Sequence, residues 1–351
     1  MPQSASGQTS RRNKIALYAR VGPELTQYDI DIDGASLNRR NTVTLPANVH
    51  YAWPHVSGRH LYVATSDSAS GMGPVGDKHH LTAFRIDPGS GALAPHGEPI
   101  PLPTRPIHMT TDIPSEHLLV AFSNPSGLRV YRINADSTPG AEVVQPEPID
   151  PGIYAHQVRV SLDNGSVILV TRGHDAAPGK SEEPGALKVF AYRQGRLTQE
   201  VSVAPNGGYG FGPRHLDFHP TRPWVYVSLE RQNKLDMFEF SGDTLSSAPV
   251  FRKDTLAEPG NIRGRQIAGT VHVHQTAALS TRSTAPQQPR NSRASASSPA
   301  EKTISLYTRS TRLPASLACS STSTAAAFTA GHFISIQAAA CWSPRTSCRS
   351  R

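Results

Sequence analysis

Residues Arg214–Glu230 read RHLDFHPTRPWVYVSLE, and this stretch defines a unit that recurs along the chain. A short apolar segment with a histidine is followed by a polar turn, and then by a strand of aliphatic or aromatic residues. The same order is found in four other places, the last of them incomplete. The copies are WPHVSGRHLYVATSD (Trp53–Asp67), PIHMTTDIPSEHLLVAFSN (Pro106–Asn124), AHQVRVSLDNGSVILVTRG (Ala155–Gly173) and VHVH (Val271–His274).

One histidine marks each copy, and successive markers are 48 to 59 residues apart. A second element, an alternating strand with a polar turn, follows each of the four full copies, as in KLDMFEFSGDTL (Lys234–Leu245). An earlier strand of this kind, PELTQYDIDIDGASL, starts at Pro23. Period-two alternation, β-branched and aromatic residues, and turns rich in Gly, Pro, Asn and Asp predict strands throughout. The marker histidines are His55, His108, His156, His215 and His272.

Units of roughly 50 residues with about four strands each predict an all-β fold of the β-propeller type. One four-stranded sheet cannot bury both of its faces alone, whereas neighbouring sheets that pack face to face can. A β-sandwich is the alternative, but a sandwich does not require such regular internal similarity. We therefore predict an incomplete propeller over residues 13–274, with a disordered N-terminus at residues 1–12.

The charge and the cysteines are concentrated at the C-terminal end of the chain. Nine Lys or Arg and one acidic residue lie in Gln275–Arg351, whereas the preceding residues carry equal numbers of basic and acidic side chains. The net charge of +8 therefore does not indicate a nucleic-acid partner for the folded part. The folded part has no cysteine, which excludes a disulfide framework or a cysteine nucleophile there. The three cysteines are Cys319, Cys341 and Cys348.

The N-terminal sequence MPQSASGQTSRRNK contains basic residues but no apolar stretch after them, so we do not expect a signal peptide. No apolar run approaches the ~20 residues of a membrane span. We expect a soluble, cytoplasmic protein with no membrane partner.

The repeat stops abruptly at Gln275, where Ser, Ala, Thr, Pro and Arg begin to dominate. Synonymous codons for Gln275–Ala285, read one base earlier, can encode PDGRFVYAFNR, which continues the repeat with its expected turn and strand. Three later segments give repeat-like strings in the same frame and in order. We interpret residues 275–351 as a frameshifted, disordered tail that replaces the last blades; an ordinary low-complexity linker is the alternative.

The string GPRHLDFHPTRPWVYVSLE, which ends at Glu230, resembles the lactonase family of seven-bladed propellers. This family includes 6-phosphogluconolactonases of one bacterial type and fungal 3-carboxy-cis,cis-muconate lactonising enzymes. The resemblance covers Asn13–His274, about five of seven blades. It implies an active site at one end of the central channel, with catalytic residues at His156, Arg214 and Glu230. A further family Arg would come from a later blade, and the chain as written lacks it.

These residue types suit the opening of a sugar lactone. His or Glu can act as a base, Arg can stabilise an oxyanion, and Arg can also bind a phosphate or carboxylate of the substrate. We therefore expect a lactonase-like hydrolase of a small lactone or carboxylate substrate, impaired in this form and without a cofactor. The alternatives are a muconate-type cyclase, a non-catalytic binding scaffold and a defective product. The oligomeric state is left open.

Each site residue also has a structural interpretation. His156 can be a repeat histidine, Glu230 a solvated strand end, and Arg214 the partner of a neighbouring carboxylate. Closely spaced histidines invite a metal interpretation, but His79-His80 and His215/His219 lack the carboxylate or cysteine partners of a recognised site. The other markers recur once per repeat and are expected to be structural: His55, His108, His215 and His272.

Limited proteolysis tests the interpretation of the tail. We expect rapid cleavage throughout Gln275–Arg351, together with lower stability and solubility than a frame-restored protein, because an open propeller exposes apolar sheet faces. Resequencing the DNA across the codons for Val271–Ala277 tests the frameshift itself. A protease-resistant tail and one sharp melting transition of the whole chain would contradict this interpretation.

Overall fold

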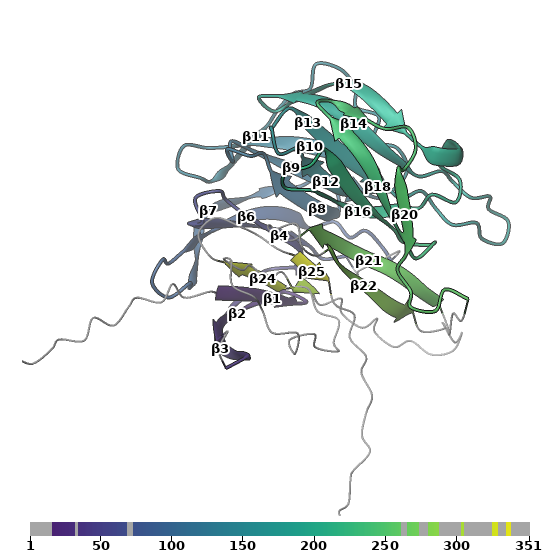
Figure 1. Ribbon diagram of the computed structural model, residues 1–351. Coiled ribbons are helices and arrows are strands. Elements are labelled where there is room, and N and C mark those ends of the chain that lie inside the picture. The colour runs from purple at the N-terminus through teal and green to yellow at the C-terminus, as the bar shows by residue number, and fades with distance from the viewer. Residues whose placement is uncertain are drawn as a thin grey trace, which may run out of the picture.

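The repeat unit folds as an antiparallel sheet of four strands that pair in chain order, in a computed structural model of the chain (Figure 1). Three sheets are complete. They are formed by β4 (Asn48–Pro54), β5 (His60–Ser66), β6 (His79–Ile86) and β7 (Leu93–Pro101); by β8 (Pro106–Thr111), β9 (His117–Ser123), β10 (Ser126–Ile133) and β11 (Pro139–Glu142); and by β12 (Ala155–Val160), β13 (Ser166–Thr171), β14 (Ala186–Arg193) and β15 (Arg196–Val203).

The next sheet divides its outer strand in two. Both β19 and β20 pair with β18, at opposite ends of that strand, so together they take the place of a fourth strand. The strands are β16 (Pro213–Phe218), β17 (Trp224–Leu229), β18 (Lys234–Ser241), β19 (Thr244–Leu245) and β20 (Phe251–Asp254).

The structure describes residues 16–31, 34–68, 73–260 and 265–273, and the backbone of four later strands. Of these four, β22 (Ser280–Gln287) pairs with β21 (Arg265–Val273), while the other three join the first sheet, where β24 pairs with β1. The predicted disordered N-terminus at residues 1–12 and the rest of the predicted tail lie outside the described residues. The first sheet contains β1 (Ala16–Val21), β2 (Glu24–Asp31), β3 (Ser36–Thr44), β23 (Thr303–Ile304), β24 (Ala325–Phe328) and β25 (Ser335–Gln337).

Consecutive sheets bury their faces against each other, as a propeller requires. One apolar cluster joins Ile168 and Val170 of β13 to Leu216 of β16 and Phe238 of β18. Three equivalent clusters join the preceding pairs of sheets. The inner strands β4, β8, β12, β16 and β21 also contact one another in succession around a common axis (Figure 1). The all-β propeller predicted from the repeat is therefore confirmed.

Each of the four inner strands β4, β8, β12 and β16 contains a β-bulge at the same place. In β12, Ala155 pairs with Thr171 and the next pair is Gln157 with Val170, so His156 is left out of the ladder. Such a bulge bends the strand and re-aims the side chain of the extra residue. The residues left out in this way are His50, Ile107, His156 and Arg214.

The histidines that mark the repeat in the sequence do not occupy equivalent positions. His55 opens the turn after its inner strand, where its backbone N–H bonds to the carbonyl oxygen of His60. His156 lies at the bulge, and His108 and His215 follow the bulge by one residue. The spacing of 48 to 59 residues therefore gave the blade length correctly, although these marker histidines lie in three different environments.

Among the described residues, the one helix is the short 3-10 turn η1 (Pro205–Gly208). No helix in the described part of the chain has the length and apolar character needed to cross a membrane.

Truncating a buried aromatic residue between two blades tests the packing. Phe238 is fully buried and lies edge-on to Phe211, with 6.2 Å between ring centroids. We expect Phe238→Ala to lower the free energy of unfolding by about 3–5 kcal/mol, because it leaves a cavity in this cluster. Phe251→Ala on the outer strand of the same blade, where the side chain is 48% exposed, should cost less than about 1 kcal/mol. Urea unfolding measures both, and equal losses would contradict the packing.

Candidate active site

Two neighbouring blades each contribute a pair of side chains at the same place in the repeat. The pair consists of the bulge residue of the inner strand and the residue that follows the second strand. In the blade of β12 and β13 these are His156 and Arg172, and in the blade of β16 and β17 they are Arg214 and Glu230. Because equivalent positions of adjacent blades face the same end of the axis, the fold brings the four together.

The Glu230 carboxylate is the centre of this group. Its Oε2 atom lies 2.5 Å from Arg172 Nε, which donates a hydrogen bond, and 3.0 Å from Arg214 Nη1. Arg172 also donates from Nη2 to Asp175 Oδ2 at 3.1 Å, and its guanidinium lies over the ring of Tyr154. Only 5% of Glu230 is exposed, so these charge-assisted contacts replace its hydration.

The two arginines decide the protonation state of Glu230. Burial alone would raise the pKa of this carboxyl, but Arg214 and Arg172 outweigh burial and hold its pKa at about 2. Glu230 is therefore a carboxylate throughout the physiological pH range. The same contacts raise the pKa of Arg172 in spite of its burial.

His156 is buried next to this charged group. Burial, together with the nearby Arg214 guanidinium, lowers the pKa of His156 well below 6.5, so the imidazole is uncharged at neutral pH. Its Nδ1 has no hydrogen-bond partner, and its ring stands edge-on to that of His215 with 5.0 Å between centroids. A neutral imidazole with an unused ring nitrogen can accept or donate a proton when substrate or water reaches it.

The structure thus brings together the three residues proposed from the sequence. Arg214 and Glu230 form an ion pair, and both act electrostatically on His156. Arg172 was not proposed from the sequence, although LVTR (Leu169–Arg172) at the end of one strand aligns with VSLE (Val227–Glu230) at the end of the next. Aligning the copies by strand pairing rather than by marker histidine would have placed Arg172 opposite Glu230.

A column of further side chains continues along the axis from His156. His215 is followed by His108, whose ring lies 4.1 Å from that of Tyr51. Burial lowers the pKa of both histidines well below the usual value, aided by neighbouring Arg and His side chains, so both are uncharged. Neither ring nitrogen of His108 has a hydrogen-bond partner. These two markers, for which the sequence predicts a structural role, are buried in the axis.

Arg159 and Asp217 end the column. Their ion pair spans 3.0 Å, and the Arg159 guanidinium lies over the Trp53 ring at 5.5 Å from its centroid. Asp217 also accepts a hydrogen bond from the Val273 backbone N–H. Burial opposes ionisation of Asp217, but Arg159 and His272 keep its pKa below the usual value. Arg159, Asp217 and Val273 connect the inner strands β12, β16 and β21, and these contacts account for the buried charges without a ligand.

One group of potential metal ligands occurs among the described residues, at Asp112, Glu116 and His117. The Asp112 carboxylate already accepts hydrogen bonds from two backbone N–H groups, from His117 Nδ1 at 2.8 Å and from Tyr192 Oη at 3.0 Å. These bonds close the turn between β8 and β9. His219, which the sequence paired with His215, likewise accepts two backbone N–H bonds of its own turn at Nδ1. Both groups therefore have a structural use.

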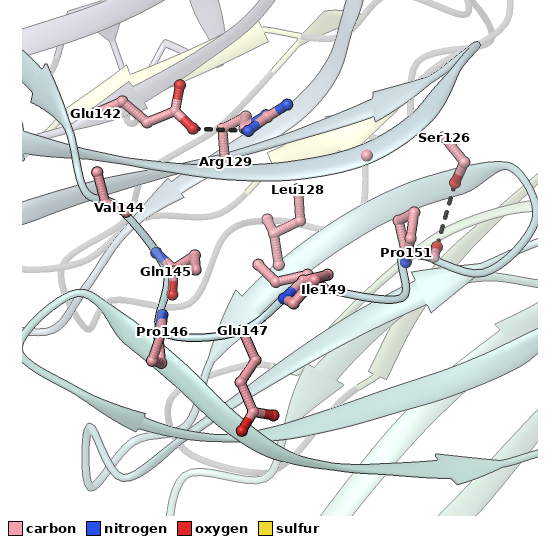
Figure 2. Close-up of a pocket in the computed structure, with 12 residues that line it drawn as sticks. Ser126, Leu128, Arg129, Glu142, Val144, Gln145, Pro146, Glu147, Ile149 and Pro151 are labelled. Carbon is pink, nitrogen blue, oxygen red and sulfur yellow. Dashed lines mark hydrogen bonds and ion pairs between the residues drawn. The ribbon is translucent and has the colours of Figure 1, made fainter.

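A groove of about 620 Å³ lies away from this site, along β10 and the segment that leads to β12 (Figure 2). Its lining includes the Arg129–Glu142 ion pair, Val144 and the residues around Pro146. None of the four central side chains lines it, so we do not assign the chemistry to this groove.

Comparisons with known proteins agree with the fold. The family described as "Lactonase, 7-bladed beta-propeller" matches residues 14–310. A 6-phosphogluconolactonase of Erwinia tasmaniensis is 27% identical over 195 residues, which cover 55% of this chain and 53% of the relative. One of Serratia proteamaculans is 25% identical over 242 residues, 69% of this chain and 65% of the relative. The chain thus spans between about half and two thirds of the length of these curated relatives.

Among solved structures, a periplasmic gluconolactonase of Pseudomonas aeruginosa superimposes with a TM-score of 0.61 at 20% identity. The match covers 77% of this chain and 76% of that protein. At this level of identity the likeness concerns the fold.

The charge on Glu230 should be visible in stability measurements. We expect Glu230→Gln to lower the free energy of unfolding by about 3 kcal/mol at neutral pH, because two buried guanidinium groups lose their counter-ion. The folded-state pKa of Glu230 is depressed, so its contribution is complete above the usual value of 4.5 and is lost as the pH falls toward about 2.

Denaturant unfolding of both proteins between about pH 3 and 7 measures this difference. The exposed pair Arg129–Glu142 provides the control, since Glu142→Gln should cost less than about 1 kcal/mol at any pH. A deficit of Glu230→Gln that is as large at pH 3 as at pH 7 would show that the ionised carboxylate is not its cause.

Proposed function

Since the chain belongs to the lactonase family of seven-bladed β-propellers, we propose that it is built to hydrolyse a sugar lactone such as 6-phosphogluconolactone. One observation carries the proposal: two arginines share a buried carboxylate beside an uncharged, buried histidine. This arrangement combines positive charge with a proton acceptor in a place that excludes most water. The 6-phosphogluconolactonase relatives support the choice of substrate class.

His156 is the proposed base. A water molecule attacks the lactone carbonyl carbon and gives a proton to the free ring nitrogen of His156, while the carbonyl oxygen becomes an oxyanion. When the intermediate collapses, the ring C–O bond breaks and the leaving alkoxide takes the proton back from the imidazolium. The product is the open hydroxy acid, and His156 returns to its neutral form.

The arginines supply the positive charge that this step needs. Arg214 lies beside His156 and is the proposed donor to the oxyanion, with Arg172 as a second cation in reach of an anionic substrate group. Glu230 is engaged by both arginines, so its proposed role is to hold the two guanidinium groups in place. Of the two bases considered from the sequence, we favour His156, because its Nδ1 has no hydrogen-bond partner and can receive a proton.

We further propose that this chain is impaired. The family resemblance implies another Arg from a later blade, and the sequence beyond residue 274 does not continue the repeat. The frame-restored protein is therefore the appropriate one to assay, beside the chain as written. The cytoplasmic location stays a prediction from the sequence.

Kinetics of the frame-restored protein test the function. We expect hydrolysis of 6-phosphogluconolactone, a loss of kcat/KM of about 100-fold or more for Arg214→Ala, and a loss of similar size for His156→Asn. His55→Asn should change kcat/KM by less than about twofold, because His55 lies in a turn outside the site. Since the pKa of His156 is depressed, the rate should fall on the acid side only well below pH 6.5.

The same assay with 3-carboxymuconate separates the alternatives. Turnover of muconate without lactone hydrolysis would assign a cyclase, and no turnover of either compound would favour a binding scaffold. An equal loss of activity in His55→Asn and Arg214→Ala would show that the catalytic site lies elsewhere.

A further inference from the structure

We propose that Arg231 is a positioning residue for this site, acting through Asp175 and the main chain at Arg172; this inference rests on the proposed function. Arg231 directly follows Glu230, and its side chain is 14% exposed. Arg231 was not among the residues proposed from the sequence. Its guanidinium contacts the segment that joins β13 to β14.

Arg231 makes three contacts with that segment. Its Nη1 donates to Glu182 Oε1 at 2.7 Å, and its Nε lies 2.5 Å from Asp175 Oδ1 in an ion pair. Its Nη2 donates to the carbonyl oxygen of Arg172 at 3.2 Å. One side chain from the blade of β16 and β17 therefore holds both ends of the segment that joins β13 to β14.

The segment itself forms a narrow hairpin. His174 and Glu183 pair through their backbones, and His174 Nδ1 lies 2.7 Å from Glu183 Oε2. Gly173 has a φ of +69°, and a Cβ atom there would lie 2.3 Å from the Glu183 carbonyl oxygen, so only glycine allows the hairpin to close. Glu182 Oε1 also accepts a bond from the Gly210 N–H. Glu182 thus links the closed hairpin both to the loop before β16 and to Arg231, which lies in the turn after β17.

Asp175 links this hairpin to the site. Its Oδ2 accepts a hydrogen bond from Arg172 Nη2, while its Oδ1 faces Arg231 Nε. The Asp175 side chain is 36% exposed, and a carboxylate so placed can rotate freely unless both oxygens are engaged. Charges consequently alternate along Arg231, Asp175, Arg172, Glu230 and Arg214.

The chain of contacts determines how Arg172 is oriented. Glu230 engages its Nε, Asp175 engages its Nη2, and Arg231 holds its carbonyl oxygen. Without Arg231, Asp175 and the hairpin lose a shared anchor, and the guanidinium of Arg172 can turn about its bond to Glu230. Small errors in the placement of a charged group are costly in catalysis. Arg231 itself need not touch the substrate.

The kinetic test uses the frame-restored protein. We expect Arg231→Gln to lower kcat for lactone hydrolysis about tenfold with a smaller change in KM, and Asp175→Asn in that background to add little further loss. Arg231→Lys should recover only part of the rate, because an ammonium group cannot make all three contacts. Arg252→Gln is the matched control: Arg252 makes two 2.7 Å bonds to Asp236 on the outer strands of the same blade, and its loss should leave kcat unchanged.

A second measurement on the chain as written does not depend on turnover. In ¹⁵N-labelled protein, the Nε–H of Arg172 should exchange with solvent at least about tenfold faster in Arg231→Gln than in the parent, and at an unchanged rate in Arg252→Gln. Unchanged exchange and kcat in Arg231→Gln, or equal effects of the two substitutions, would overturn the proposal. If the frame-restored protein lacks lactonase activity while exchange in the chain as written responds as expected, the proposed function fails and the positioning by Arg231 stands.

Discussion

The fold depends on the burial of two apolar faces per sheet. A single four-stranded sheet cannot bury both of its apolar faces, so each sheet packs on the next one. The cluster that contains Ile168 and Phe238 is an example. Burial of this kind contributes roughly 25 cal/mol per Å² of apolar surface, which exceeds any single polar contact at the site when summed over a blade. The position of every inner strand around the axis follows from this packing.

A repeated irregularity then turns the scaffold into a site. The bulge in each of β4, β8, β12 and β16 releases one residue from the ladder, and the blades place different side chains there. Ile107 makes this position apolar in one blade, whereas His156 and Arg214 place ionisable side chains there in the next two. The same backbone device thus serves both packing and chemistry, and the choice of residue decides between them.

Charge pairing holds the active positions in place. The Glu230 carboxylate loses its hydration on burial and contacts two guanidinium groups instead. These groups keep Glu230 ionised, and Glu230 in turn keeps both of them oriented. The neighbouring His156 responds to the same burial by losing its charge. Both pKa values are lowered, which leaves Glu230 charged and His156 uncharged, and strongly perturbed pKa values in neighbouring groups are typical of catalytic sites.

The sequence by itself determined the fold class, because period-two alternation and a repeat of about 50 residues are local properties that survive without coordinates. It also predicted a site at His156, Arg214 and Glu230 through a resemblance to a family motif, and the structure places these three side chains together. It did not reveal Arg172 or Arg231, and it placed His55 and His156 at equivalent positions of the repeat. Only the tertiary structure decided these points, since strand register, a one-residue bulge and contacts between blades set which side chains meet, and a one-residue change in register sends a side chain to the other face of the sheet.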